Sequence, residues 1–207
     1  MGMQVADIAG AVRRADEAMA HLEQVLNEAD SKLGDGDTGS MLSRVFARLA
    51  AVDLHEEHDL GRAFGALALA AAAATGSSLG TLLSAALMTM GKKTRGQSEL
   101  EWTAVSTLFA AARDVMMARG RANLGDKTVL DGLDALVTAI AALGDSKAIA
   151  AASVKAAGDA LERFRGVPCR IGRARMFAER SMELDDPGML AFARLTEAVA
   201  ARSPAGA

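Results

Sequence analysis

The sequence predicts an all-α protein in which eight helices run up and down as an antiparallel bundle. Apolar residues recur every three or four positions over most of the chain, which is the period of an amphipathic helix. Alanine is abundant, whereas aromatic residues make up only 3% and tyrosine is absent, and strands depend on aromatic and β-branched residues. Only three prolines interrupt 207 residues, so long helical windows stay unbroken. We expect one domain over residues 1–207, with a frayed tail at 203–207.

The first four helices are expected around two loops that are rich in glycine and hydroxyl residues. The expected helical spans are residues 7–29, 39–52, 60–74 and 79–90. In the first of them, Ile8, Met19 and Leu26 belong to one apolar stripe. The loop after the third helix, residues 75–81, has small side chains that let a ligand or another backbone come close. An ordinary turn with a serine cap is the alternative reading of that loop.

Capping signals place the fifth and sixth helices. Ser98 and Glu101 match a capping box for the fifth helix, which Gly120 ends. Asp126 is expected to cap the sixth helix. The surrounding run, residues 125–128, is not a Walker A loop, because the upstream glycine at the required spacing is missing.

The seventh helix is expected over residues 146–164, and Asp186 and Pro187 open the eighth as its N-cap and first helical residue. Between these helices, residues 165–185 form the least regular part of the second half. This segment carries Arg170, Arg173, Arg175 and Arg180. A charged loop is usually just solvated, but arginine is also the natural partner of phosphate oxygens, which it binds in bidentate geometry.

Charge and cysteine content exclude several functions. The formal net charge of −3 provides no basic field for nucleic acid. A single cysteine, Cys169, leaves no internal disulfide, fits a reducing cytosol and cannot form a Cys-rich zinc site. The N-terminus lacks the pattern of a signal peptide, and the most apolar run, residues 63–74, is too short to span a bilayer. We therefore expect a cytoplasmic protein that binds neither nucleic acid nor membrane.

The stretch from residue 30 to residue 41 is the strongest candidate for function. It holds three carboxylates, on Asp30, Asp35 and Asp37, and it leads into a helix that starts near Gly39. Crowded carboxylates repel one another unless cations lie between them, and Mg²⁺ takes oxygen ligands that it shares with phosphates. A helix start also offers free N–H groups to an anion. The stretch therefore indicates a metal and phosphate site; an acidic turn with capping aspartates is the alternative.

The expected up-and-down packing gathers the unusual loops at one end. In such a bundle, the loops that follow odd-numbered helices share one rim. These loops cover residues 30–40, 76–81, 120–127 and 173–188. The same rim thus receives the acidic stretch, the serine-rich loop and the arginine-rich segment, which favours the functional interpretation over a chance acidic turn.

Four motifs in this order resemble those of the L-type, nucleotide-binding subunit of dihydroxyacetone kinase. They are residues 33–39 (LGDGDTG), 76–80 (GSSLG), 125–131 (GDKTVLD) and the segment 172–188. The resemblance spans nearly the whole chain. It departs from the family's usual pattern at Thr38, where a histidine is usual, and at residues 175–177, where an aromatic-containing form is usual.

The resemblance implies an eight-helix barrel with the nucleotide ADP or ATP bound at one rim. It implies that Asp30, Asp35 and Asp37 hold two Mg²⁺ ions that bridge the nucleotide phosphates. The implied nucleotide-binding residues are Thr38, Gly39, Ser40, Met41, Ser77, Ser78, Gly120, Val129, Arg173, Asp186, Pro187 and Gly188. Among them, Arg173 is the candidate catalytic residue, because an arginine near the phosphates stabilises charge that develops during phosphoryl transfer.

The resemblance also implies partners. In the family, a separate K-type subunit holds the ketose, and in some members a phosphohistidine carrier of the phosphotransferase system recharges bound ADP. Free ATP as the donor, a four-carbon ketose such as erythrulose as the substrate, and an ADP-binding regulatory module remain alternatives. His55 and His58 lie in the loop after the second helix, where an exposed polar loop is favoured over a metal pair.

Overall fold

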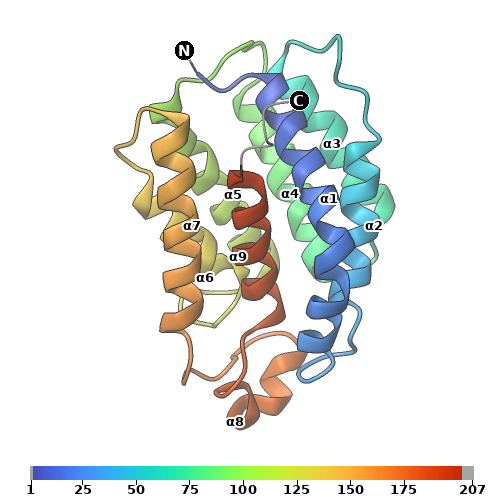
Figure 1. Cartoon of the computed structure of the whole chain (residues 1–207), viewed down its shortest axis with the longest axis vertical. Helices are drawn as coiled ribbons and strands as arrows, with labels where there is room; N and C mark the ends of the chain where they lie inside the picture. The colour runs from blue at the N-terminus through green and yellow to red at the C-terminus, as the bar shows by residue number, and fades with distance from the viewer. Residues whose placement is uncertain (1, 202–207) are drawn as a thin grey trace.

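Eight long helices alternate in direction and close into a ring in the computed structural model, which describes residues 2–201 (Figure 1). A ninth helix, α8, has four residues and lies at the lower end of the view. The bounds are α1 Val5–Asp30, α2 Thr38–Ala50, α3 Leu60–Ala74, α4 Ser78–Lys93, α5 Val105–Gly120, α6 Val129–Ala139, α7 Ser146–Arg163, α8 Ala178–Ser181 and α9 Pro187–Ala200. The predicted all-α up-and-down fold is confirmed. The expected frayed tail, residues 203–207, lies outside the described residues.

The ring closes because each long helix packs on the next one along the chain and α9 returns to α1. The apolar stripes of these helices meet in one main core, to which Met19 of α1, Val45 of α2 and Leu67 of α3 contribute. Leu130 of α6 and Met189 of α9 join the same core. None of these five side chains is more than 3% exposed, and Ile8 and Leu26 lie in the same core as Met19, so the apolar stripe predicted for the first helix is confirmed.

The predicted start of the fifth helix is wrong. Ser98 and Glu101 form no capping box; instead Leu100 pairs with Met3 in an isolated β-bridge. The Met3 N–H donates to the Leu100 carbonyl at 2.7 Å, and the Leu100 N–H donates back at 2.9 Å. This pairing keeps the chain extended up to Glu101, so a 3₁₀ turn at Trp102–Ala104 comes next and α5 starts only at Val105.

The predicted cap of the sixth helix is also wrong, by two residues. Thr128 is the N-cap of α6, and Asp131 completes a capping box by accepting the Thr128 N–H at 2.8 Å. The carboxylate of Asp126 instead accepts the N–H of Asn123 at 2.7 Å, inside the preceding loop. Lys127, between the two, has φ of 60°, a left-handed conformation that no helix could include.

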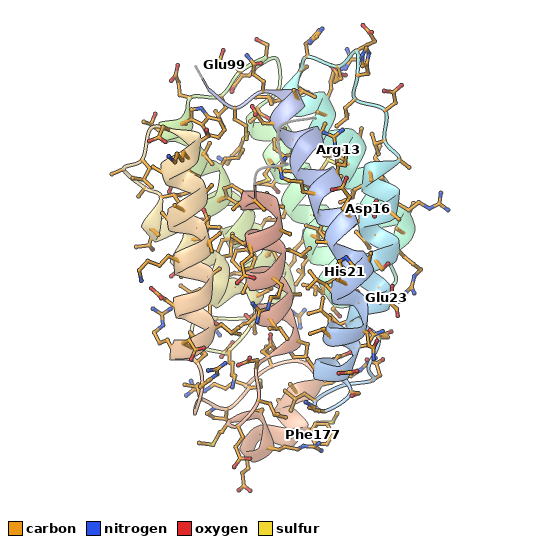
Figure 2. The ribbon with its side chains drawn as sticks, in the orientation of Figure 1. Arg13, Asp16, His21, Glu23, Glu99 and Phe177 are labelled. Carbon is orange, nitrogen blue, oxygen red and sulfur yellow. The ribbon has the colours of Figure 1, made fainter. Side chains whose placement is uncertain are left out.

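The two ends of the barrel differ. In Figure 1 the N-terminus and the loop between α2 and α3 lie at the upper end, and the loop between α1 and α2 lies at the lower end with α8. Figure 2 shows Glu99 near the upper end and Phe177 at the lower tip. In residues 2–201, no helix is both long and apolar enough to cross a membrane.

Candidate functional site

The acidic loop at the lower end is a tight turn built around the last residue of α1. Asp30 ends that helix, and its carbonyl accepts the Gly34 N–H at 2.6 Å. A Cβ on Gly34 would stand 2.4 Å from an oxygen of the Asp30 side chain, so a larger residue there would displace the Asp30 carboxylate. Gly36 has φ of +77°, which also favours glycine. These glycines let the chain fold back over Asp30 before α2 begins.

Three carboxylates meet at this turn. One oxygen from each of Asp30, Asp35 and Asp37 lies within 4.8 Å of the others, and this is the one group of three or more potential ligands among residues 2–201. Asp30 is buried and accepts the N–H groups of Asp37 at 3.0 Å and Thr38 at 3.2 Å. Asp37 is the N-cap of α2, yet its side chain accepts no capping hydrogen bond. The cluster therefore presents oxygen ligands of the kind that Mg²⁺ prefers.

The residues that follow the aspartates mostly face the barrel. A Cβ on Gly39 would clash with the Glu23 carbonyl, so the first turn of α2 packs directly on α1. The Ser40 N–H donates to Asn27 at 3.0 Å, and the Ser40 hydroxyl donates to Glu23 at 2.8 Å. That hydroxyl is the largest cause holding the pKa of Glu23 below its usual range. Met41 is buried in the core.

Thr38, the first residue of α2, is half-buried beside the cluster. It is therefore the member of the 38–41 segment that remains best placed to meet a ligand.

Arg173 reaches the acidic cluster from the far end of the sequence. It opens a 3₁₀ turn, Arg173–Phe177, and its guanidinium forms an ion pair with the carboxylate of Asp35. Both side chains are accessible, with 63% of Arg173 and 46% of Asp35 exposed. The contact joins the loop after α1 to the segment between α7 and α9. These are two of the loops that were predicted to share one rim.

The starts of α6 and α9 form a second part of this end. Asp186 caps α9 by accepting the Met189 N–H at 2.8 Å, and Pro187 is the first helical residue, as expected. A Cβ on Gly188 would stand 3.7 Å from the Cβ of Val129, which begins α6. Burial raises the pKa of Asp186 to about 6, and its hydrogen bonds and Lys127 only partly offset this.

The serine-rich loop stands apart from these contacts. The Ser77 hydroxyl is the N-cap of α4, accepting the Gly80 N–H at 3.0 Å, so the capping interpretation applies to it. Ser78, the next residue, is exposed. Gly120 ends α5 next to α4, where an added Cβ would stand 3.3 Å from Leu82. The contacts described within residues 2–201 join none of these three predicted residues to the acidic cluster.

Sequence reasoning missed the role of Lys127. Its side chain is 2% exposed, and its ammonium group donates to three backbone carbonyls, of Val167 at 2.9 Å, Ser181 at 2.7 Å and Leu184 at 2.8 Å. The available signals were the lysine within residues 125–128, which lack the upstream glycine of a Walker A loop, and the place of residues 125–131 among the four family motifs. These three carbonyls lie in the segment that carries Arg173, so Lys127 connects the start of α6 to that segment.

Comparison with known proteins agrees with this arrangement. The family model described as the DAK2 domain matches residues 32–201. The chain belongs to the DAK2 domain family. The resemblance to the L-type subunit of dihydroxyacetone kinase, read from four motifs, is thereby confirmed at the level of the family.

Two relatives of this chain differ in how much of their length it covers. An L-erythrulose 1-kinase of Mycolicibacterium smegmatis is 32% identical over 93% of this chain, which spans only 35% of that protein. The ADP-binding subunit DhaL of a PTS-dependent dihydroxyacetone kinase, from Lactococcus lactis, is 27% identical over 88% of this chain and 89% of its own length. The chain thus spans about a third of the erythrulose kinase and most of the DhaL subunit.

Solved structures show the same fold. The native dihydroxyacetone kinase of C. freundii matches with a TM-score of 0.75 and 27% identity, over 94% of this chain and 34% of that chain. The same kinase in complex with AMP-PNP and Mg²⁺ matches with a TM-score of 0.70 and 25% identity, over 97% of this chain and 34% of that chain.

Proposed function

We propose that this chain is the nucleotide-binding subunit of a ketose kinase, which carries the phosphoryl group for a short ketose bound on a separate K-type subunit. The observation that carries the proposal is the group of three carboxylate oxygens within 4.8 Å of one another, placed where α2 begins and paired with Arg173. Relatives named as ADP-binding subunits of dihydroxyacetone kinase, and a related structure with AMP-PNP and Mg²⁺, support this assignment.

Asp30, Asp35 and Asp37 would hold two Mg²⁺ ions. The donor set fits such ions because Asp30 is held by two backbone N–H groups and the Asp37 carboxylate accepts no capping bond. Bound Mg²⁺ would neutralise the nucleotide phosphates and screen the repulsion of the incoming oxygen. Thr38 offers one hydroxyl to a phosphate oxygen at the N-terminus of α2, where the helix dipole favours negative charge.

Arg173 would act on the phosphoryl group itself. Its planar fork presents several N–H donors, and an arginine in this role contributes orders of magnitude to phosphoryl transfer. Its ion pair with Asp35 lies beside the proposed ligands, so a short movement of an exposed side chain would bring it to the phosphates.

The ketose and its proton acceptor would belong to the partner. His21 is exposed on the outer side of α1, well above the lower rim in Figure 2. His55 and His58 lie in the loop between α2 and α3, at the opposite end from the acidic loop (Figure 1). We therefore assign this chain the nucleotide and assign the ketose to the K-type subunit.

The decisive experiment is reconstitution. We would mix the purified chain with a K-type subunit, Mg²⁺ and either dihydroxyacetone or erythrulose, and measure ketose phosphate. One arm supplies ATP, and the other supplies ADP with phosphoenolpyruvate and the phosphotransferase proteins, so the active arm identifies the donor. Asp37→Asn should abolish turnover, whereas Asp159→Asn, at an exposed surface pair on α7, should not.

If this chain alone forms ketose phosphate as fast as the mixture does, the assignment of the ketose to a K-type subunit is wrong. Mg²⁺-dependent ADP binding without transfer in either arm would favour the regulatory module.

A further inference from the structure

Lys127 is a fully buried cation whose hydrogen bonds are all made within the protein. An ammonium group has three N–H donors, and each finds a backbone carbonyl at 2.7 to 2.9 Å. Burial lowers the pKa of Lys127, while Cys169, Asp186 and Asp185 favour its charged form. A buried charge is tolerated when it is hydrogen-bonded, and it strongly penalises any arrangement that leaves it unpaired.

The backbone on both sides of Lys127 is held by hydrogen bonds that do not involve the lysine side chain. Lys127 has φ of 60°, which a residue with a side chain rarely adopts. The carboxylate of Asp131 accepts the N–H of Gly125 at 2.6 Å and that of Thr128 at 2.8 Å, on either side of the lysine. These bonds aim the lysine side chain away from α6 and toward the segment after α7.

The three carbonyls lie on both stems of one loop. Val167 precedes the turn Arg173–Phe177, and Ser181 and Leu184 follow it. The loop is also tied internally, because the Ser181 hydroxyl accepts the Cys169 N–H at 2.8 Å and donates to the Ala178 carbonyl at 2.6 Å. Lys127 therefore closes the base of the loop on whose arc Arg173 sits.

We propose that Lys127 is a positioning residue that holds the loop 167–184, and with it Arg173, against the acidic cluster. The claim that Lys127 affects catalysis through Arg173 rests on the proposed function. The claim that Lys127 holds the loop 167–184 does not. The turn that carries Arg173 also belongs, through Ala174, to a small apolar cluster with Leu33 and Cys169, and the Arg170 N–H donates to the Asp126 carbonyl at 3.1 Å. Lys127 bonds to both stems of the loop at once, so its loss should free the loop as a whole.

The test compares Lys127→Met with Lys155→Met, which removes an exposed lysine from α7. Hydrogen exchange followed by mass spectrometry should show at least about tenfold faster exchange over residues 167–184 in Lys127→Met, with α1 to α4 unchanged. Lys155→Met should leave residues 167–184 as in the native chain. Unchanged protection of this loop in Lys127→Met would overturn the proposal, whatever the activity.

The catalytic half is tested by a double-mutant cycle in the reconstituted kinase. Lys127→Met should lower kcat at least about tenfold with little change in KM for the ketose, and Lys127→Met with Arg173→Ala should be no slower than Arg173→Ala alone. Additive losses would mean that Lys127 does not act through Arg173. If the native mixture transfers no phosphate, the proposed function is wrong. The hydrogen-exchange measurement still shows whether Lys127 holds the loop 167–184.

A second variant covers the case in which Lys127→Met does not fold. Lys127→Gln keeps a polar side chain without the charge, and its two N–H donors can pair with at most two of the three carbonyls. It should speed exchange over the same loop and lower kcat in the same direction, to a smaller extent. A folded Lys127→Gln chain with native exchange in this loop would contradict the proposal.

Discussion

The guanidinium of Arg173 forms an ion pair with the carboxylate of Asp35, joining the loop after α1 to the turn before α8. A divalent ion that binds the acidic cluster has to share Asp35 with this arginine or displace it. The pair therefore couples metal binding to the position of the residue that we assign to phosphoryl transfer.

Arg173→Ala should bind a divalent ion more tightly than the native chain when no nucleotide is present. An exposed ion pair contributes no more than about 1 kcal/mol, so we expect a gain of about two- to fivefold in Mn²⁺ affinity. Titration of free Mn²⁺ by electron paramagnetic resonance measures it, with Arg165→Ala as the control, because Arg165 pairs with Asp185 outside the cluster. Weaker Mn²⁺ binding in Arg173→Ala would show that the pair does not compete with the metal.

Arg173→Lys should keep most of the affinity for Mg²⁺ and ADP and lose most of the turnover in the reconstituted kinase. A lysine supplies the charge but not the planar fork that binds two oxygens at once. We expect a drop in kcat of at least about a hundredfold, which is less than the roughly 10³- to 10⁵-fold that such an arginine contributes, because lysine keeps the positive charge. Calorimetry gives the affinity and a coupled assay gives kcat; a variant with native kcat would remove Arg173 from the catalytic role.

Nucleotide binding should require a divalent ion. Asp30, Asp35 and Asp37 otherwise present negative charge to the phosphates at close range. Calorimetry with ADP in Mg²⁺ and in EDTA tests this, and binding should be lost in EDTA and restored by adding Mg²⁺. Equal affinity in the two buffers would exclude the proposed metal bridge.

Two aspartates of the cluster should differ in their effect on stability without ligands. Asp30 is buried and accepts two backbone N–H groups, so Asp30→Ala leaves two partly buried donors unpaired and should cost about 1–3 kcal/mol. Asp35 is exposed, so Asp35→Ala should change stability by less than about 1 kcal/mol while abolishing nucleotide binding. Urea unfolding of both variants measures the difference; a large loss in Asp35→Ala would make Asp35 a structural residue.

Asp186 should make the fold less stable as the pH rises. Its folded pKa is raised to about 6 from 3.8, so between these values the folded chain binds a proton that the unfolded chain has lost. This contribution is fully present below about pH 4 and is lost as the pH rises through about 6, a change on the order of 3 kcal/mol. Asp186→Asn keeps a good N-cap and should flatten this slope in urea unfolding across that range. An unchanged slope would mean that Asp186 is ionised in the fold.

The sequence by itself determined the eight long helices and the buried apolar stripe of the first of them. A repeat of three to four residues is local information, and burial of the apolar stripe is what stabilises a helix in a small protein. The order of the motifs likewise identified the family, and the alternation of helix directions predicted that residues 30–40 and 173–188 share one rim.

Only the tertiary structure decided where α5 begins and what the loops hold. Leu100 pairs with Met3 rather than allowing a capping box, because that contact joins chain segments far apart in sequence. The buried position of Lys127 and the ion pair of Arg173 with Asp35 depend on loops that the folded barrel brings together. The spacing of apolar residues along the chain cannot predict such contacts, because each one depends on where residues of another element lie in the fold.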